Sequence, residues 1–237
     1  SNDPWKGKEV LYRMNPENIP CLTAAKIDYC SLANNHILDW GYPGLTETLE
    51  TLKKARIKYS GAGQNLKEAE TPAILEVEGK GRVLVLSFGS ETSGVPFTWA
   101  ASLKKAGVNL LPDFSERTVQ YIKAKVQEVK KPGDILVASI HWGGNWGYEV
   151  PRSQTEFAHK LIDLAGVDVI HGHSSHHVKG IGVYKGKLVL YSCGDFLNDY
   201  EGIRGYDSYR DDLALMYFVS VDPVSYTHLT LPTKRIV

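Results

Sequence analysis

Four of the eight histidines in this 237-residue chain lie within seven consecutive positions, from His171 to His177. The short β-branched run at 167–170 predicts a buried strand, which we expect to break into a loop at Gly172. Neutral imidazoles at a strand end are common ligands of first-row transition metals, because each ring offers a lone pair without adding charge. The sequence therefore predicts a metal site here, and the alternative is a polar loop that is simply rich in histidine.

Two other predicted strands also end in side chains that can bind a metal. The strand predicted at 27–33 ends at Asn34-Asn35-His36, and the strand predicted at 135–140 ends at His141. Loops at the strand ends of an α/β sheet converge on one crevice, so these side chains should meet His173 and His176 there. An ion bound by imidazole and amide oxygen lowers the pKa of a bound water and polarises a phosphoryl or carbonyl oxygen. His36 would then protonate a leaving group.

The composition limits the classes of protein to which the chain can belong. Lys and Arg number 27, as do Asp and Glu, so no net positive field attracts nucleic acid or an anionic membrane. No apolar run approaches the roughly 20 residues that a membrane helix needs. Cys21, Cys30 and Cys193 lack the Cys-x-x-Cys spacing of a thiolate metal site, and we interpret them as core thiols.

Strands and helices alternate along the chain. Helices are predicted at 45–54, 115–131 and 152–165, and hairpins at 73–89 and 181–193. This alternation predicts an α/β sandwich with mixed sheets, in a single domain over 1–223. The stretch 90–112 has little periodicity, and we expect a long surface insertion that either covers the site or is a passive loop.

The last residues, 224–237, do not continue this pattern. Their Val-Ser-Tyr-Thr-His-Leu can be written in codons that reproduce a transposon end used in sequencing libraries. We therefore predict a non-native tail and leave His228 out of the site. A natural C-terminal extension is the alternative.

Several motifs, taken together in order, resemble the bacterial CapA family. They are Ser-Leu-Ala-Asn-Asn-His-x-Leu-Asp-x-Gly at 31–41, Gly-Ala-Gly-x-Asn-Leu at 61–66, Ser-Ile-His-Trp-Gly at 139–143, Gly-His-x-x-His at 172–176 and Tyr-Ser-x-Gly-Asp-Phe at 191–196. The match spans roughly Tyr12 to Asp222. That family is associated with poly-γ-glutamate capsule synthesis, and its fold is similar to that of calcineurin-like metallophosphoesterases.

The resemblance implies roles for individual residues. Asn35 matches the asparagine ligand of the metallophosphoesterase Asn-His motif, and His36 matches its catalytic histidine. The remaining ligands implied for one or more divalent ions of the Mn, Zn or Fe class are His141, His173 and His176. Asn34, His171 and His177 lie beside this pattern, and each is either a group that supports the ligands or a polar loop residue.

Two features differ from the family pattern. Family members begin with a strand ending in Gly-Asp, followed later by Asn-Leu-Glu, and neither motif occurs in this sequence. We therefore expect that the first strands of the fold, with their acidic ligands, are missing from it. Asp195 stands where the family more often has asparagine. It either hydrogen-bonds a ligand histidine or forms a turn after Gly194.

The resemblance implies a metal-dependent, phosphoesterase-like hydrolase in poly-γ-glutamate capsule biosynthesis. The alternative is a non-catalytic component that handles or exports the polymer and retains the fold. The expected partners are an anionic polymer or phosphoester substrate and other capsule-synthesis proteins, with no nucleic acid. The family also suggests association with the bacterial cell envelope.

Overall fold

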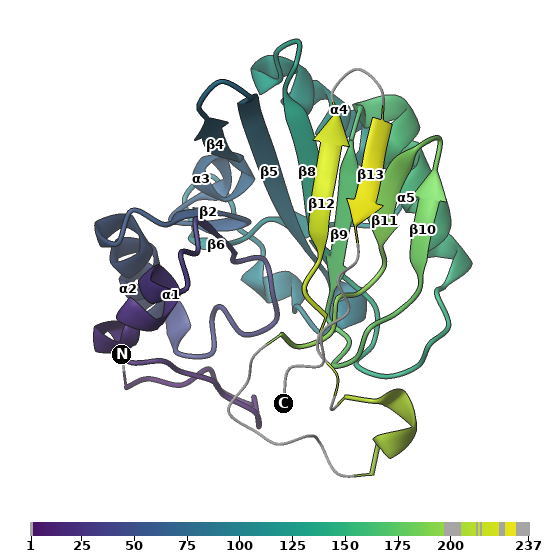
Figure 1. Ribbon diagram of the computed structural model, residues 1–237. Coiled ribbons are helices and arrows are strands. Elements are labelled where there is room, and N and C mark those ends of the chain that lie inside the picture. Colours follow the sequence, from purple (N-terminus) through teal and green to yellow (C-terminus); the bar gives the residue numbers. More distant parts are fainter. Residues whose placement is uncertain (1, 197–204, 212, 214, 223–225, 231–237) are drawn as a thin grey trace.

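A large mixed sheet forms the centre of the molecule in the computed structural model, which describes residues 2–196, 205–211, 213, 215–222 and 226–230 (Figure 1). Its strand order is β10-β11-β9-β8-β5-β4, with β7 paired to β5. These strands are β4 (Ala73–Val77), β5 (Gly81–Ser90), β7 (Leu110–Leu111), β8 (Ile135–His141), β9 (Val169–His173), β10 (Ile181–Tyr184) and β11 (Lys187–Leu190). Strands β5, β8, β9 and β11 are parallel, whereas the hairpin strands β4 and β10 are antiparallel at the two edges.

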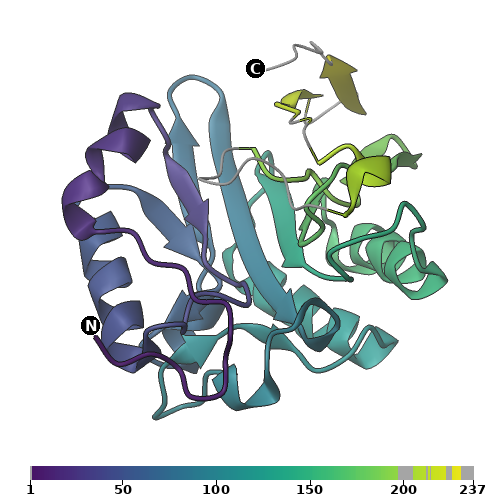
Figure 2. The same cartoon turned by 90° about the horizontal axis from the view of Figure 1, so that it is seen from below.

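Two amphipathic helices, α4 (Glu116–Val129) and α5 (Arg152–Ala165), cover one face of this sheet (Figures 1 and 2). α4 ends two residues before the predicted end at 131, and each helix carries a cap at one end. Ser115 caps α4 by accepting a hydrogen bond from the Thr118 amide, and Gly166 ends α5 in the left-handed conformation, with φ 69°. Their buried residues pack with the sheet in one hydrophobic cluster, which includes Leu84, Ile140 and Phe157.

A second layer lies over the other face of the large sheet. Strands β1 (Tyr29–Ser31) and β2 (Lys58–Ser60) pair in parallel, and α2 (Gly41–Lys54) packs on them through Leu45, Leu49 and Leu52. Short elements complete this part: η1 (Pro16–Asn18), α1 (Pro20–Ala24), β3 (Ala62–Gly63), α3 (Leu66–Glu70), η2 (Glu91–Ser93), η3 (Phe97–Trp99) and β6 (Gly107–Val108), which pairs with β3. The predicted α/β sandwich with mixed sheets is confirmed.

Polar side chains line the face of the large sheet that points toward β1 and β2. Ser139 is in register with His171, and His141 is in register with His173, so all four side chains lie on one face of the parallel pair β8–β9. On the neighbouring strand, Ser87 contacts the Tyr29 and Ser31 hydroxyls of β1. The two sheets therefore meet through hydroxyl and imidazole groups, and these form the surroundings of the candidate site.

The prediction that the chain breaks at Gly172 is wrong. β9 continues through Gly172 to His173, so His171 and His173 are strand residues and only His176 and His177 lie beyond the strand. Gly172 is needed for space rather than for a turn. A Cβ atom here would lie 2.6 Å from Trp142 Nε1 and 2.7 Å from the Leu190 carbonyl oxygen. β11 and the Trp142 ring can therefore approach β9 closely.

The stretch 90–112 is not a surface insertion. Trp99 and Val108 are fully buried in the core beneath α2, and β7 joins the edge of the large sheet. Part of the same stretch contacts the candidate site, because the Ser93 hydroxyl donates to the His141 carbonyl oxygen at 2.7 Å. In the sequence of 90–112, large apolar side chains are scattered among small and polar residues. The stretch therefore shows no helical or strand period.

Near its C-terminus the chain forms η4 (Asp207–Tyr209) and an antiparallel pair, β12 (Phe218–Asp222) and β13 (Tyr226–Thr230). The sequence predicts a last strand at 211–221, and the strand among the described residues begins later, at Phe218, and ends one residue later, at Asp222. Residues 224, 225 and 231–237 of the predicted tail lie outside the described residues, and its non-native origin stays a prediction. No helix in the described ranges is long and apolar enough to cross a lipid bilayer.

Candidate metal centre

His141 and His173, the last residues of β8 and β9, are in direct contact. Their Nδ1 atoms are 3.0 Å apart. Asn35, from the loop after β1, places its Oδ1 atom 3.1 Å from His141 Nε2. Three of the four predicted ligands therefore come together from three strands that are distant in the sequence.

A continuous series of hydrogen bonds fixes the protons on these rings. Because Asn35 Oδ1 only accepts, His141 donates from Nε2, and its bare Nδ1 accepts from His173 Nδ1. His173 Nε2 then accepts from the Ser139 hydroxyl at 3.1 Å, and Ser139 accepts from His171 Nδ1 at 3.0 Å. Both ring nitrogens of His141 and His173 therefore take part in hydrogen bonds in their neutral form.

Electrostatics favour the same neutral state. Burial lowers the pKa of His141 to about 3, with smaller contributions from His36 and His176. Burial also lowers the pKa of His173 well below its usual value, helped by His141 and His171. The pKa of His171 is lowered by burial as well. Near neutral pH these imidazoles keep lone pairs for an ion without first losing a proton.

The contacts of His141 use both of its ring nitrogens, with Nδ1 facing His173 and Nε2 facing Asn35. Two nitrogen ligands at about 2.0–2.1 Å from a tetrahedral metal are about 3.3 Å apart. The 3.0 Å and 3.1 Å contacts of His141 are close to this value, but they involve opposite nitrogens of its ring, which must turn to bring all three donors to one point. The imidazole and amide groups are of the chemical types that bind divalent ions, and binding one ion through all three would require the His141 ring to turn. Within the described ranges no three His, Cys, Asp or Glu side chains form a metal-binding group.

His36 lies in a loop that other side chains hold in place. Asn34 Oδ1 accepts from the His36 amide at 2.8 Å, so Asn34 shapes the turn. Asp39, which is 1% exposed, accepts from His36 Nδ1 at 2.7 Å. Lys8 donates to Asp39 and, at 2.7 Å, to the Asn35 carbonyl oxygen. These contacts leave the other ring nitrogen of His36 for chemistry.

Sequence reasoning missed Ser139, Asp39 and Lys8. Ser139 stands two residues before His141, and this strand period alone places both on one face. Asp39 follows His36 by three residues within the quoted motif. Although burial raises it, hydrogen bonds from His36 and Lys8 keep the pKa of Asp39 below its usual value. Lys8 had no sequence signal, because it lies in an irregular segment 28 residues before His36.

The fourth predicted ligand, His176, is held by Asp195. Its Nδ1 atom lies 2.8 Å from Asp195 Oδ2, and its backbone amide donates to the Asn145 carbonyl oxygen. Asp195 therefore contacts a predicted ligand histidine, as one of the two interpretations of that residue expected. His176 also contributes to the lowered pKa of His141.

Two other histidines lie apart from the ligands. His177 is fully buried among aromatic rings, including Tyr148 and Tyr209, and its Nε2 atom has no hydrogen-bond partner among the described residues. His159 stacks on Tyr184 with ring centroids 3.7 Å apart, on the outside of α5. His171, by contrast, belongs to the hydrogen-bond series through Ser139.

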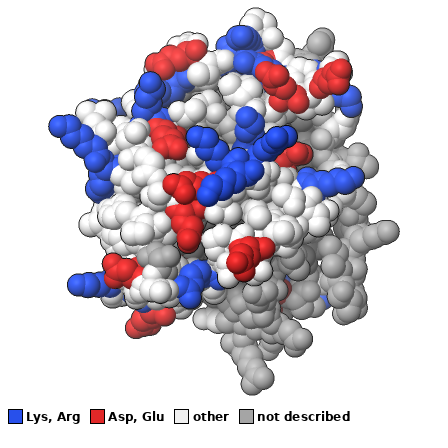
Figure 3. Space-filling model, turned by 90° about the vertical axis from the view of Figure 1, so that its left-hand side faces the viewer, with Lys and Arg blue, Asp and Glu red and all other residues white. Residues whose placement is uncertain are grey.

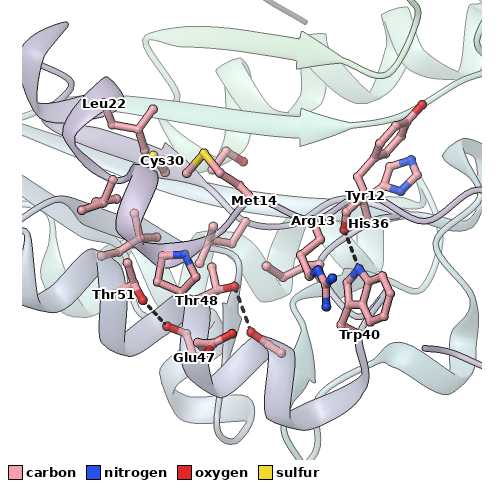
Figure 4. Close-up of a pocket in the computed structure, with 17 residues that line it drawn as sticks. Tyr12, Arg13, Met14, Leu22, Cys30, His36, Trp40, Glu47, Thr48 and Thr51 are labelled. Carbon is pink, nitrogen blue, oxygen red and sulfur yellow. Dashed lines mark hydrogen bonds between the residues drawn. The ribbon is translucent and has the colours of Figure 1, made fainter. Parts of the chain in front are cut away.

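A largely apolar cavity of about 360 Å³ borders His36 (Figure 4). The close-up shows Tyr12, His36, Arg13 and Trp40 together at one end, and Leu22 and Cys30 at the other. The Arg13 guanidinium lies over the Trp40 ring, 4.2 Å from its centroid. The cavity therefore combines apolar walls with a positive group near the candidate catalytic histidine.

Comparison with known proteins identifies the family of this chain. Residues 1–200 match the family described as bacterial capsule synthesis protein PGA_cap. The chain belongs to this family. Because the match includes Asn35, His36, His141, His173 and His176, the whole candidate centre lies in the part of the chain that PGA_cap proteins share.

Curated relatives match almost the whole chain. A probable polyglutamine synthesis accessory protein of Mycobacterium tuberculosis is 48% identical over 225 residues, which are 94% of this chain and 59% of the relative. The PGA biosynthesis protein CapA of Bacillus subtilis is 30% identical over 89% of this chain and 52% of its own length. The capsule biosynthesis protein CapA of Bacillus anthracis is 29% identical, over 85% and 47%. The chain thus spans about half the length of these PGA_cap relatives.

Proposed function

We propose that this chain carries the hydrolytic centre of a poly-γ-glutamate capsule biosynthesis protein, with a metal-dependent, phosphoesterase-like site. The contact of His141 with both His173 and Asn35 carries the proposal. Three neutral donors from distant segments meet where parallel strands end, which is the usual position of an active site in an α/β sheet. The names of the relatives support the polymer, because they refer to polyglutamine, PGA and capsule synthesis.

Each residue has a distinct task in this proposal. Asn35, His141, His173 and His176 would hold a divalent ion, which supplies Lewis acidity and a water of lowered pKa. Ser139 orients His173, and Asp195 orients His176. His36, held at Nδ1 by Asp39, donates a proton from Nε2 to the leaving group. The cavity beside His36 gives an apolar part of that leaving group room.

A second candidate function is a non-catalytic component that handles or exports the polymer. One observation favours it, since the described residues bring no carboxylate directly against His141 or His173. Hydrolytic dinuclear sites commonly include carboxylate ligands that bridge or neutralise the ions. The two candidates differ in one measurable property, which is metal-dependent turnover.

The test compares His173→Ala with His159→Ala. After chelation and reloading with Mn²⁺ or Zn²⁺, bound metal and hydrolysis of a phosphodiester are measured for the unaltered chain and both variants. We expect His173→Ala to lose both the bound metal and the metal-dependent turnover. His159→Ala should keep both, because the His159 ring only packs on Tyr184. Bound metal without turnover would favour the non-catalytic component. Metal content that is equal in both variants would contradict the centre itself.

A further inference from the structure

A broad hollow lies on the flank of the molecule formed by α2, β2, α3 and β4. Its volume is about 890 Å³, and none of its lining residues belongs to the candidate metal centre or to the cavity beside His36. Figure 3 shows this side of the molecule, and Lys and Arg side chains gather near the middle of the face with acidic side chains around them. The hollow is therefore a separate feature with a positive lining.

Four exposed cations line the hollow: Lys53 and Arg56 at the end of α2, Lys58 at the start of β2, and Lys67 in α3. Within the described part of the chain, none of these four side chains forms a hydrogen bond or ion pair. The chain as a whole has no net formal charge, so this local excess of positive charge is an asymmetry of the surface. Unpaired cations around a concave surface attract anions.

One acidic side chain, Glu68, also lines the hollow, but it is already bound. Its Oε1 atom accepts from the Tyr59 hydroxyl at 3.1 Å, and its Oε2 atom accepts from the Gln64 amide at 2.7 Å. Glu68 is thus turned toward its own helix start and forms no ion pair with the four cations, so the lining carries four positive charges and one negative charge. The half-buried apolar side chains of Pro72 and Ile74 form part of the wall.

We propose that this hollow binds a stretch of an anionic, flexible polycarboxylate chain and holds the polymer on the protein apart from the hydrolytic centre. The cations would pair with successive carboxylates, and the apolar wall would contact the methylene groups between them. A single-stranded nucleic acid fits less well. Such chains stack their bases on exposed aromatic rings, and the ring in this lining, Tyr59, is tied to Glu68.

This inference rests on the polymer of the proposed function, but its test does not need turnover. Fluorescein-labelled poly-γ-glutamate is titrated with the full chain in EDTA, and binding is followed by fluorescence anisotropy. The test variant carries Lys53→Gln, Arg56→Gln, Lys58→Gln and Lys67→Gln. The matched control carries the same four changes of charge at exposed positions outside the hollow, as Lys80→Gln, Lys104→Gln, Arg117→Gln and Lys131→Gln.

We expect the hollow variant to bind the polymer roughly tenfold more weakly or worse, and the control variant to change little. A variant with Lys53→Arg, Lys58→Arg and Lys67→Arg keeps the charge and should bind like the unaltered chain. Higher salt should weaken binding because the pairs are exposed. Circular dichroism melting verifies that all variants fold. Equal losses in both variants would overturn the proposal, as would equally tight binding of a single-stranded oligonucleotide of the same charge.

Two further measurements separate this proposal from the proposed function. If His173→Ala binds the polymer normally while turnover disappears, both proposals stand. If neither the unaltered chain nor any variant hydrolyses a substrate, the proposed hydrolytic centre is wrong. Selective loss of polymer binding in the hollow variant would still support the polymer site in the hollow. If only His173→Ala loses polymer binding, the polymer is held at the metal centre and the hollow is not its site.

Discussion

Asp39 holds the His36 ring in place, and in the proposed function it would orient the proton that His36 donates. The Asp39 carboxylate accepts from His36 Nδ1 and is itself held by Lys8 and by the Tyr12 amide. We expect Asp39→Asn to lower kcat by about 10- to 100-fold for poor leaving groups, which need the proton, and much less for p-nitrophenolate, which does not. The measurement is a series of aryl phosphodiesters of increasing leaving-group pKa.

Asp163→Asn is the control for this series. Asp163 pairs with Lys185 at the surface and is remote from His36. Its variant should show the leaving-group dependence of the unaltered chain. If the rates with Asp39→Asn fall equally for all leaving groups, Asp39 acts on the fold of the loop and not on the proton of His36.

The buried histidines predict how stability depends on pH. The pKa of His141 is about 3 in the folded chain and near 6.5 when unfolded, so between these values the unfolded chain binds more protons. Stability therefore falls as the pH drops below about 6.5, by up to about 1.4 kcal/mol per pH unit for this group. Urea unfolding in EDTA between about pH 5 and pH 7, where most carboxylates remain ionised, measures the slope.

His141→Gln should reduce the dependence of the unfolding free energy on pH by the contribution of one titrating histidine. The histidines His171 and His173 have lowered pKa values for the same reason and should maintain the remaining slope. A slope that is unchanged in His141→Gln would show that the ring is not buried in its neutral form.

At the scale of elements, Gly172 decides whether β9 and β11 can lie side by side. A methyl group here would press on the Leu190 and Tyr191 carbonyl oxygens and on Trp142 Nε1, which donates to Tyr191. We expect Gly172→Ala to destabilise the fold by about 1–3 kcal/mol and to weaken metal binding, since His171 and His173 flank it. Gly180→Ala has no neighbour within 4 Å and should change neither property.

Chemical denaturation and metal titration of both variants measure this difference. A Gly172→Ala chain with unaltered stability would mean that β11 shifts to accommodate the methyl group. In that case the spacing between the strands does not determine the geometry of the site.

Strands, helices and caps were largely predictable because their signals are local. Ser115 and Gly166 marked helix ends by residue type, and the apolar run before His141 marked a buried strand. Gly172 was misjudged because glycine has two uses, a turn or a close approach, and the choice depends on Leu190 and Trp142. Ser139 could have been found from its strand period with His141, whereas Lys8 lies in an irregular segment whose partners are far along the chain.

At the scale of the whole molecule, ion binding should stabilise the fold. His141, His173 and Asn35 join both layers of the sandwich, and an ion that binds only the folded chain adds RT ln(1 + [L]/Kd), or about 2.7 kcal/mol at 100 times Kd. We expect Mn²⁺ or Zn²⁺ to raise Tm. Ser139→Ala should lower the affinity by about 10- to 100-fold, because it removes the group that orients His173.

Ser87→Ala is the matched control on the neighbouring strand. Ser87 is in register with Ser139 and equally buried, but it contacts Tyr29 and Ser31 and not a histidine. Its loss should lower Tm without changing the increment that the metal adds. If both serines reduce the increment equally, the effect comes from looser packing between the sheets.

His141 follows Asn35 by 106 positions, so the two residues are synthesised at different times. Asn35 leaves the ribosome long before the strands that carry its partners exist, and the His173 strand follows later still. Under the proposed function, an ion that needs all three donors would bind only after both halves of the sandwich have closed.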